Sequence, residues 1–181
     1  TPSSITDNST KEPEVVNVES VSITNRISTL NLGDDYEIEY EVLPANATNK
    51  KVSFSSSKPD VVSVDRSTGK LTANASGTAT ITVKTEDGDK TDSFDVLVPV
   101  AVTGINIALN ASSVYVGDEV DFTVSVLPED ATDKSYELTT ATADLLSIEG
   151  KKVTAIKEGH ASLTAKAGSI EKTINFDVKK T

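Results

Sequence analysis

The chain contains no cysteine, which excludes a disulfide framework, a thiol nucleophile and any zinc or iron–sulfur site built on thiolates. It contains one histidine, His160, so sites that need two imidazoles are excluded and Ser-His-Asp chemistry would rest on this residue alone. Tryptophan is absent and aromatic residues make up 4% of the sequence, which argues against stacking platforms for bases or sugars. We therefore expect no enzyme, no catalytic residue, and no bound cofactor or metal.

Basic residues are scarce as well: 17 Lys and Arg stand against 28 Asp and Glu, for a formal net charge of -11. Nucleic acids and anionic membrane surfaces are bound through Lys and Arg that neutralise phosphate, so neither is an expected partner. The longest apolar run, residues 96–102, is far shorter than the ~20 residues that cross a bilayer, so we expect no membrane insertion.

The first 18 residues are rich in Ser, Thr, Pro and acidic side chains and have almost no apolar residue before Val15. Such a composition buries too little surface to offset chain entropy, so we predict a flexible tether over residues 1–18. Val15, Val16 and Val18 are the exception. They could add as an edge strand to their own domain or to a neighbour.

The rest of the chain is an internal repeat, because residues 43–50 (LPANATNK) recur 84 positions later as residues 127–134 (LPEDATDK). Other matches follow: Gly33-Asp34 with Gly117-Asp118, Gly77 with Gly159, and Phe94-x-Val96 with Phe176-x-Val178. The last two are 82 positions apart, and the two missing residues are placed where residues 65–70 shorten to 149–152. A loss confined to a turn indicates one fold used twice, since surface turns tolerate deletion.

Each repeat has the pattern of short strands between turns. Residues 36–42 alternate apolar and acidic side chains, and their counterparts 120–126 alternate apolar and polar ones. Residues 78–83 alternate Thr with apolar side chains. Ile174, Phe176 and Val178 form another inward row. Glycines suited to positive φ separate these segments, at Thr68-Gly69, Asp87-Gly88, Gly150 and Gly168. Some seven strands in about 80 residues, each buried on one face, predict an Ig-like β-sandwich.

The first repeat resembles the bacterial Ig-like domain, group 2, through residues 47–57 (ATNKKVSFSSS), 64–65, 69–73 and 77–83. The second repeat is more diverged and keeps Pro128, Ala131-Thr132, Gly150-Lys151, Val153-Thr154-Ala155 and Gly159. The resemblance covers roughly 19–98 and 102–179. One departure thins the core: the family often has Trp where Phe54 and Leu138 stand.

The resemblance implies no catalytic residues. It implies surface and extracellular modules: stalks of adhesins, repeats in cell-envelope and glycan-utilisation proteins, and decorations on phage capsids and tails. We predict an all-β chain of two tandem Ig-like β-sandwiches, residues 19–98 and 99–181, joined end to end after the leader. The linker at Pro99–Ala101 is too short to act as a flexible tether, so we expect limited bending between the two domains.

Acidic clusters are the candidate calcium sites, because Ca²⁺ takes six to eight oxygen ligands. They are Asp34-Asp35, Glu86–Asp89, Asp118-Glu119, and Glu129-Asp130 with Asp133. None has EF-hand spacing, so we interpret them as solvated turns and assign no metal ligand. A weak site between the domains, near Pro99 with Asp118 or the 86–89 hairpin tip, stays open.

The single histidine follows Gly159 at a predicted turn and has no partner motif, so we place His160 on the surface. Tyr36 and Tyr40 share the inward parity of their strand and are predicted in the core, whereas Tyr115 and Tyr136 could stack on sugars if exposed. The sequons at Asn8, Asn46, Asn74 and Asn110 are interpreted as chance in a bacterial or phage protein.

These observations predict a non-enzymatic structural or adhesive stalk or decoration, extracellular, on a bacterial cell surface or a phage virion. One alternative is a glycan- or receptor-binding module that uses loops at one end of a sandwich. The other is a self-assembling subunit in which residues 15–18 add as a strand to the next copy. The partner would be a protein or glycan on a host or neighbouring cell, or a second copy.

Overall fold

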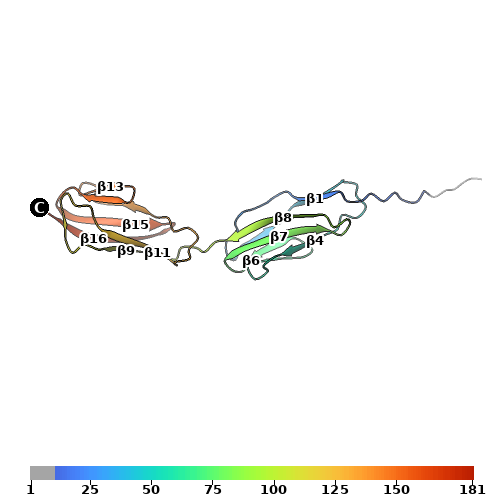
Figure 1. Ribbon diagram of the computed structural model, residues 1–181, viewed down its shortest axis with the longest axis horizontal. Coiled ribbons are helices and arrows are strands. Elements are labelled where there is room, and N and C mark those ends of the chain that lie inside the picture. The colour runs from blue at the N-terminus through green and yellow to red at the C-terminus, as the bar shows by residue number, and fades with distance from the viewer. Residues whose placement is uncertain (1–10) are drawn as a thin grey trace, which may run out of the picture. The chain divides into compact units, whose positions relative to one another are not determined.

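The computed structural model describes residues 11–181, which form strands and turns and contain no helix (Figure 1). The all-β prediction is therefore confirmed. Contacts divide the chain into two compact units, with the boundary between Val98 and Pro99. We call the part up to Val98 the first unit and the part from Pro99 the second unit. Residues 1–10 of the predicted tether lie outside the described residues.

Residues 11–98 of the first unit form eight strands: β1 (Ser20–Ile23), β2 (Asp35–Glu37), β3 (Tyr40–Leu43), β4 (Val52–Ser56), β5 (Val62–Val64), β6 (Lys70–Ala73), β7 (Gly77–Thr85) and β8 (Thr91–Val98). β1 pairs with β3, β6 lies between β2 and β5, and β7 lies between β4 and β8. Every one of these pairings is antiparallel.

The second unit also has eight: β9 (Gly104–Leu109), β10 (Val114–Tyr115), β11 (Phe122–Leu127), β12 (Glu137–Thr139), β13 (Leu146–Glu149), β14 (Lys152–Ala155), β15 (Gly159–Ala167) and β16 (Ile170–Lys179). β9 pairs with β11 and β13 with β14, while a larger sheet runs in the order β10-β16-β15-β12. Glycines 69, 88, 150 and 168 all have positive φ, which confirms the predicted turns. The Leu43-Pro44 and Leu127-Pro128 peptide bonds are both cis.

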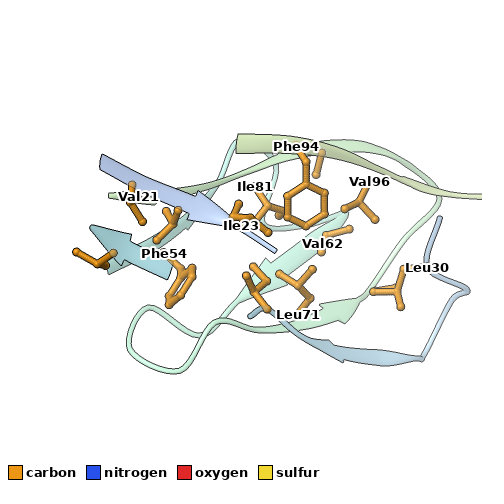
Figure 2. Packing of buried hydrophobic residues seen from close by; sticks show 14 of the residues in the cluster. Val21, Ile23, Leu30, Phe54, Val62, Leu71, Ile81, Phe94 and Val96 are labelled. Atoms are coloured by element: carbon orange, nitrogen blue, oxygen red, sulfur yellow. The ribbon is translucent and has the colours of Figure 1, made fainter. Parts of the chain in front are cut away.

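Each unit encloses its own apolar core. β7 and β15 show the same alternation of buried and accessible side chains along all nine residues, as the Thr/apolar pattern predicts. Ile81 of β7 is fully buried among side chains that include Phe54, Leu71 and Phe94 (Figure 2). Leu163 is its fully buried counterpart in the second unit. The repeated pattern therefore builds two equivalent cores.

The predicted strand over residues 36–42 is in fact two strands in different sheets. β2 pairs with β6, β3 pairs with β1, and Ile38 and Glu39 lie between them. Ile38 is buried and donates its backbone N–H to the Gly69 carbonyl. The placement of Tyr40 in the core was wrong. Its side chain is 40% exposed because Phe54 fills the interior and Tyr40 meets it edge-on, with ring centroids 5.5 Å apart.

The last hairpin shows that the repeat loses residues in a second turn. Ile81 pairs with Phe94, whereas its counterpart Leu163 pairs with Ile174. The structural counterpart of Phe94 is therefore Ile174, and the sequence match to Phe176 was wrong by two residues. The turns at the ends of the two hairpins account for this difference of two residues. The first unit has the tip 86–89, whereas in the second unit Ala167 and Ile170 pair across only two residues. Surface turns absorbed both deletions.

Candidate functional site

The hairpin tip at residues 86–89 is present, but its carboxylates serve different partners. The Asp87 carboxylate accepts the backbone N–H of Val18 at 2.8 Å. Glu86 accepts the side-chain amide of Asn49 at 2.9 Å. Asp89 pairs with Lys84 at 2.8 Å, and the hydrogen bond from Lys84 lowers the pKa of Asp89. The tip therefore has a structural role, because its carboxylates bind Val18, Asn49 and Lys84 in three different segments.

The remaining acidic clusters are dispersed in the same way. The Thr72 hydroxyl and the Lys70 ammonium both hydrogen-bond the Asp35 carboxylate and lower its pKa. Asp118 accepts the backbone N–H of Tyr115, and Glu119 pairs with Lys152 at 3.3 Å. The Ser135 side chain and, to a lesser extent, the Ser135 N–H hydrogen-bond the Asp133 carboxylate and lower its pKa. Across residues 11–181 no group of three or more His, Asp or Glu side chains is placed to hold a metal ion.

The calcium site considered near Pro99 stays a hypothesis, and each acidic group named for it has a defined position within its own unit. β8 starts next to the 86–89 tip and carries the chain roughly 25 Å away from it to Val98. In the second unit, β11 starts next to Asp118 and pairs with β9 along its length, so Asp118 lies at the far end of that pair from Gly104. Neither acidic group lies near the linker.

The histidine lies on a strand rather than at the predicted turn. His160 is in β15 opposite Asp177 of β16, and its Nδ1 is 2.8 Å from an Asp177 carboxylate oxygen. Both side chains are exposed, at 71% and 72%, so solvent screens the pair. The surface placement is confirmed, and the Asp partner was not foreseen.

The four tyrosines occupy different environments. Tyr36 is half-buried and donates its hydroxyl to the Asn25 carbonyl at 2.6 Å, so its predicted packing against the core is confirmed. Tyr115 is 41% exposed. Tyr136 is half-buried at the start of β12, and the Lys151 ammonium lies 4.2 Å from its ring centroid. Tyr136 also borders two hollows of the surface.

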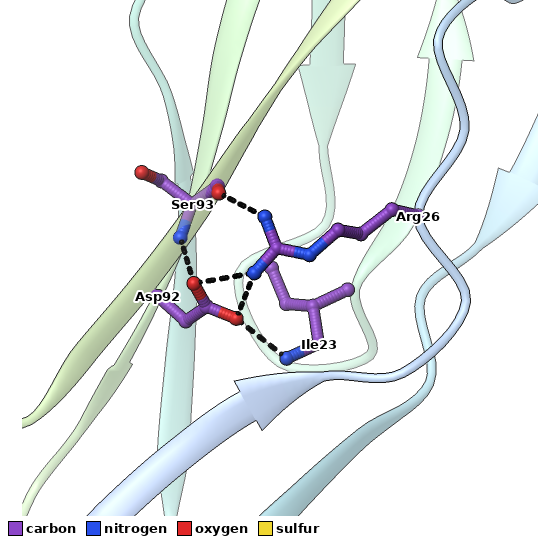
Figure 3. A network of polar contacts seen from close by, with 4 residues as sticks. All are labelled: Ile23, Arg26, Asp92 and Ser93. Atoms are coloured by element: carbon purple, nitrogen blue, oxygen red, sulfur yellow. Dashed lines mark hydrogen bonds and ion pairs between the residues drawn. The ribbon is translucent and has the colours of Figure 1, made fainter.

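A polar network that the sequence did not indicate joins the edges of two sheets in the first unit (Figure 3). Arg26, just after β1, contacts both carboxylate oxygens of Asp92 on β8, at 2.7 and 2.6 Å. Arg26 also donates to the Ser93 carbonyl, and Asp92 accepts the Ile23 N–H at 2.8 Å. Burial alone would raise the pKa of Asp92, but the hydrogen bonds from Ile23, Arg26 and Ser93 outweigh it and lower the pKa.

The same pair of hydrogen bonds fixes the start of each unit, and we call it the N-terminal clamp. Val16 donates its N–H to the Thr48 hydroxyl at 2.9 Å, and the Thr48 N–H donates to the Val16 carbonyl at 2.8 Å. Val100 and Thr132 make the identical exchange, at 2.8 and 3.0 Å. The predicted linker residue Val100 is thus bound to the unit that follows it.

The clamp corrects the predicted end of the tether. Val18 is 4% exposed and belongs to the first core, although the prediction placed it in residues 1–18. Its neighbour Val16 is held by Thr48, whereas Val15 is 70% exposed. Composition misled here because the burial of Val18 depends on β-strand residues far away in the sequence. The segment before β1 belongs to the first unit, as the segment from Pro99 belongs to the second.

Comparison with known proteins finds a family match within the first unit. Residues 17–94 match the family model of the bacterial Ig-like domain, group 2. A stretch of 84 residues, 46% of the chain, is 42% identical to an Ig-like virion protein of Serratia phage KSP90 and covers 33% of that protein. A stretch of 83 residues is 45% identical to a kappa-carrageenase of Pseudoalteromonas carrageenovora and covers 21% of it. The chain thus spans a third or less of these relatives.

Among solved structures, the chain is similar to Sidekick-1 immunoglobulin domains 1-5, with a TM-score of 0.53 over 97% of the chain and 41% of that structure. The sequence identity is 9%, so the likeness concerns the fold alone. It confirms the immunoglobulin-like fold. In the part of the chain that the structure describes, no helix is long and apolar enough to cross a membrane.

Proposed function

We propose that the chain is a pair of bacterial Ig-like modules, starting from the group 2 domain found in residues 17–94, and that it serves as a structural stalk or decoration. We propose an extracellular site, on a bacterial cell surface or a phage virion. The likeness to a phage virion protein supports this location. The closed apolar cores and antiparallel ladders give modules that keep their shape without a ligand, and their acidic surface favours solubility.

The observation that carries the proposal of two copies is the repetition of the pairing scheme together with the clamp. The β7–β8 and β15–β16 hairpins pair throughout, and β4 and β12 join the same side of them. The Val16–Thr48 and Val100–Thr132 exchanges use the same atoms. An unrelated β-domain would have no reason to reproduce both, so we infer that the second unit is a diverged copy of the first.

A non-catalytic role is part of the proposal. His160 and Asp177 form a hydrogen-bonded pair, yet both are widely exposed on an open sheet face, where catalytic electrostatics are weak. The likeness to a kappa-carrageenase covers 21% of that protein, so we take it as a likeness between modules. Of the rival functions, strand donation by residues 15–18 is the less favoured, since Val16 and Val18 are held by their own unit.

Labelling tests the external location. An antibody raised against this chain should label intact cells or intact virions of the source without lysis, while an antibody against a cytoplasmic protein should not. Labelling that appears only after lysis would contradict the proposal.

Light scattering after size exclusion tests self-assembly. A stalk or decoration module should have a mass of 19.1 kDa at every concentration. Growth of the mass with concentration would instead make assembly the function to explain.

A further inference from the structure

The two units differ in the loop that lies over β4 in the first unit and over its counterpart β12 in the second. In the first unit, the four-residue loop 66–69 closes over β4: Phe54 donates its N–H to the Arg66 carbonyl at 3.0 Å, and Ile38 donates to the Gly69 carbonyl at 3.2 Å. Phe54 is 4% exposed beneath the loop, while a hollow of about 420 Å³ lies beside it, lined by residues that include Val52, Ser53 and Arg66.

In the second unit, Gly150 and Lys151 replace that loop, because Glu149 pairs directly with Lys152. The shorter turn makes no backbone hydrogen bond to Phe122 or Leu138, the counterparts of Ile38 and Phe54. Both side chains are only partly buried. The deletion therefore leaves these two side chains less covered than their counterparts Ile38 and Phe54, which are both 4% exposed.

A hollow of about 450 Å³ lies at the shortened turn. Its lining consists of Glu119, Val120, Asp121, Phe122, Tyr136 and Lys151. A second hollow of about 420 Å³ also borders Tyr136 and is lined by Ser135, Glu137, Lys166 and Gly168. Tyr136 is shared by both, so its ring is the central apolar surface of a polar depression. In the first unit its place is taken by Val52. The first unit has a hollow of the same volume as the second hollow, about 420 Å³, at the corresponding place, beside Val52 and Lys84.

The chemistry of this depression fits a sugar. A pyranose ring offers a C–H face that packs on an aromatic ring and a rim of hydroxyls that needs acceptors and donors. The Lys151 ammonium lies over the Tyr136 ring, 4.2 Å from its centroid, so a sugar that packs on this face takes the place of the ammonium. Glu119 and Asp121 are exposed acceptors at the margin, and Lys151 is a donor.

We propose that the Tyr136 depression of the second unit binds a neutral pyranose residue of a glycan. The sugar packs against Tyr136, its hydroxyls donate to Glu119 and Asp121, and Lys151 donates to a sugar oxygen. Two carboxylates at the margin and a net charge of -11 repel anionic sugars, which selects neutral ones. This ligand role goes beyond the structural role proposed above and does not depend on it.

The test is a titration of the ¹⁵N-labelled full chain with three tetrasaccharides, of β-1,4-glucose, α-1,4-glucose and β-1,4-mannose, to about 20 mM, well above a millimolar Kd. At least one should give saturable amide shifts at Glu119, Phe122, Tyr136 and Lys151. Tyr136→Val should weaken binding about tenfold. This variant should fold, because the first unit has Val52 at the same position. Tyr115→Val, at another exposed tyrosine, should bind as the unchanged chain does.

Glu119→Gln provides a second variant at the margin, and it should weaken the same titration by severalfold because an amide is a poorer acceptor than a carboxylate. Flat titrations with all three sugars would overturn the proposal. Saturable shifts that survive Tyr136→Val, or that map to the first unit, would overturn it as well. Shifts at the same amides caused by a short peptide but by no sugar would assign the depression to a protein partner instead.

Discussion

Gly69 lies directly beneath the ring of Phe54, so close that a Cβ on Gly69 would stand 2.8 Å from the ring's Cζ. The backbone of Gly69 has a φ of +76°, a conformation that side chains disfavour. A side chain at residue 69 would therefore press on the Phe54 ring that the loop covers. At Gly150, in the shortened turn of the second unit, a Cβ would meet nothing within 4 Å.

Gly69→Ala should destabilise the first unit by about 2–4 kcal/mol, since it adds a close contact with the buried Phe54 ring to the cost of a positive φ. Gly150→Ala is the matched control. Its φ is +65° and a Cβ there meets nothing within 4 Å, so only the cost of the φ, about 1–2 kcal/mol, should appear. Urea unfolding of both variants measures the difference, and equal losses would show that Phe54 moves aside freely.

Ile81→Ala and Leu163→Ala should each cost about 2–5 kcal/mol, because both side chains are fully buried and leave a cavity. Each substitution should lower the transition of its own unit, as followed by calorimetry. Ile156→Ala, at a side chain that is 48% exposed, should change stability by less than about 1 kcal/mol. A core variant that melts like the unchanged chain would place its side chain outside the core.

Thr48→Val and Thr132→Val should release the N-terminal clamp, because valine keeps the shape of threonine and removes the hydroxyl acceptor. The Val16 amide should then exchange faster in the first variant and the Val100 amide in the second, each by about 2- to 10-fold for a bond worth 0.5–1.5 kcal/mol. Hydrogen exchange followed by NMR makes the measurement. Thr48→Ser and Thr132→Ser keep the hydroxyl and should leave exchange unchanged; accelerated exchange in these variants would point to packing instead.

Asp92→Asn should lower the stability of the first unit at neutral pH and matter little in acid. The folded-state pKa of Asp92 is depressed by its hydrogen bonds, so its stabilisation is present above the unfolded pKa of about 3.9 and is lost as pH falls through the folded pKa. Thermal melts from pH 7 to pH 2 should therefore converge for the variant and the unchanged chain below about pH 4. Asp60→Asn, at an exposed loop position, removes the same charge and should melt like the unchanged chain at every pH.

Local patterns predicted the parts of the fold that depend on near neighbours. The Thr/apolar alternation placed β7 correctly, and the positive φ of Gly69 and Gly150 followed from the turns they occupy. The repeat also showed correctly where the 65–70 turn shortens, because a deletion between two matched strings leaves a visible change of offset.

Distant pairings could not be predicted in the same way. Arg26 and Asp92 are 66 residues apart, and no local pattern distinguishes this pair from the many other charges of an acidic chain. The sheet switch before Tyr40 depends on which strand each half pairs with. The hollow at Tyr136 depends on how the shortened turn at Lys151 packs beside residues 119–122, which are distant from it in sequence.

The N-terminal clamp also has a consequence for how such a chain can be duplicated. Thr48 and Thr132 each bind a residue that precedes the first strand of their unit. The segment that would be duplicated as one piece therefore begins near Val15 or Pro99, ahead of that strand. A copy that began at the first strand would lack the clamp, whereas a copy that began a few residues earlier would include it. Under the proposal that the second unit is a copy of the first, every further copy that begins at this position would keep its own clamp.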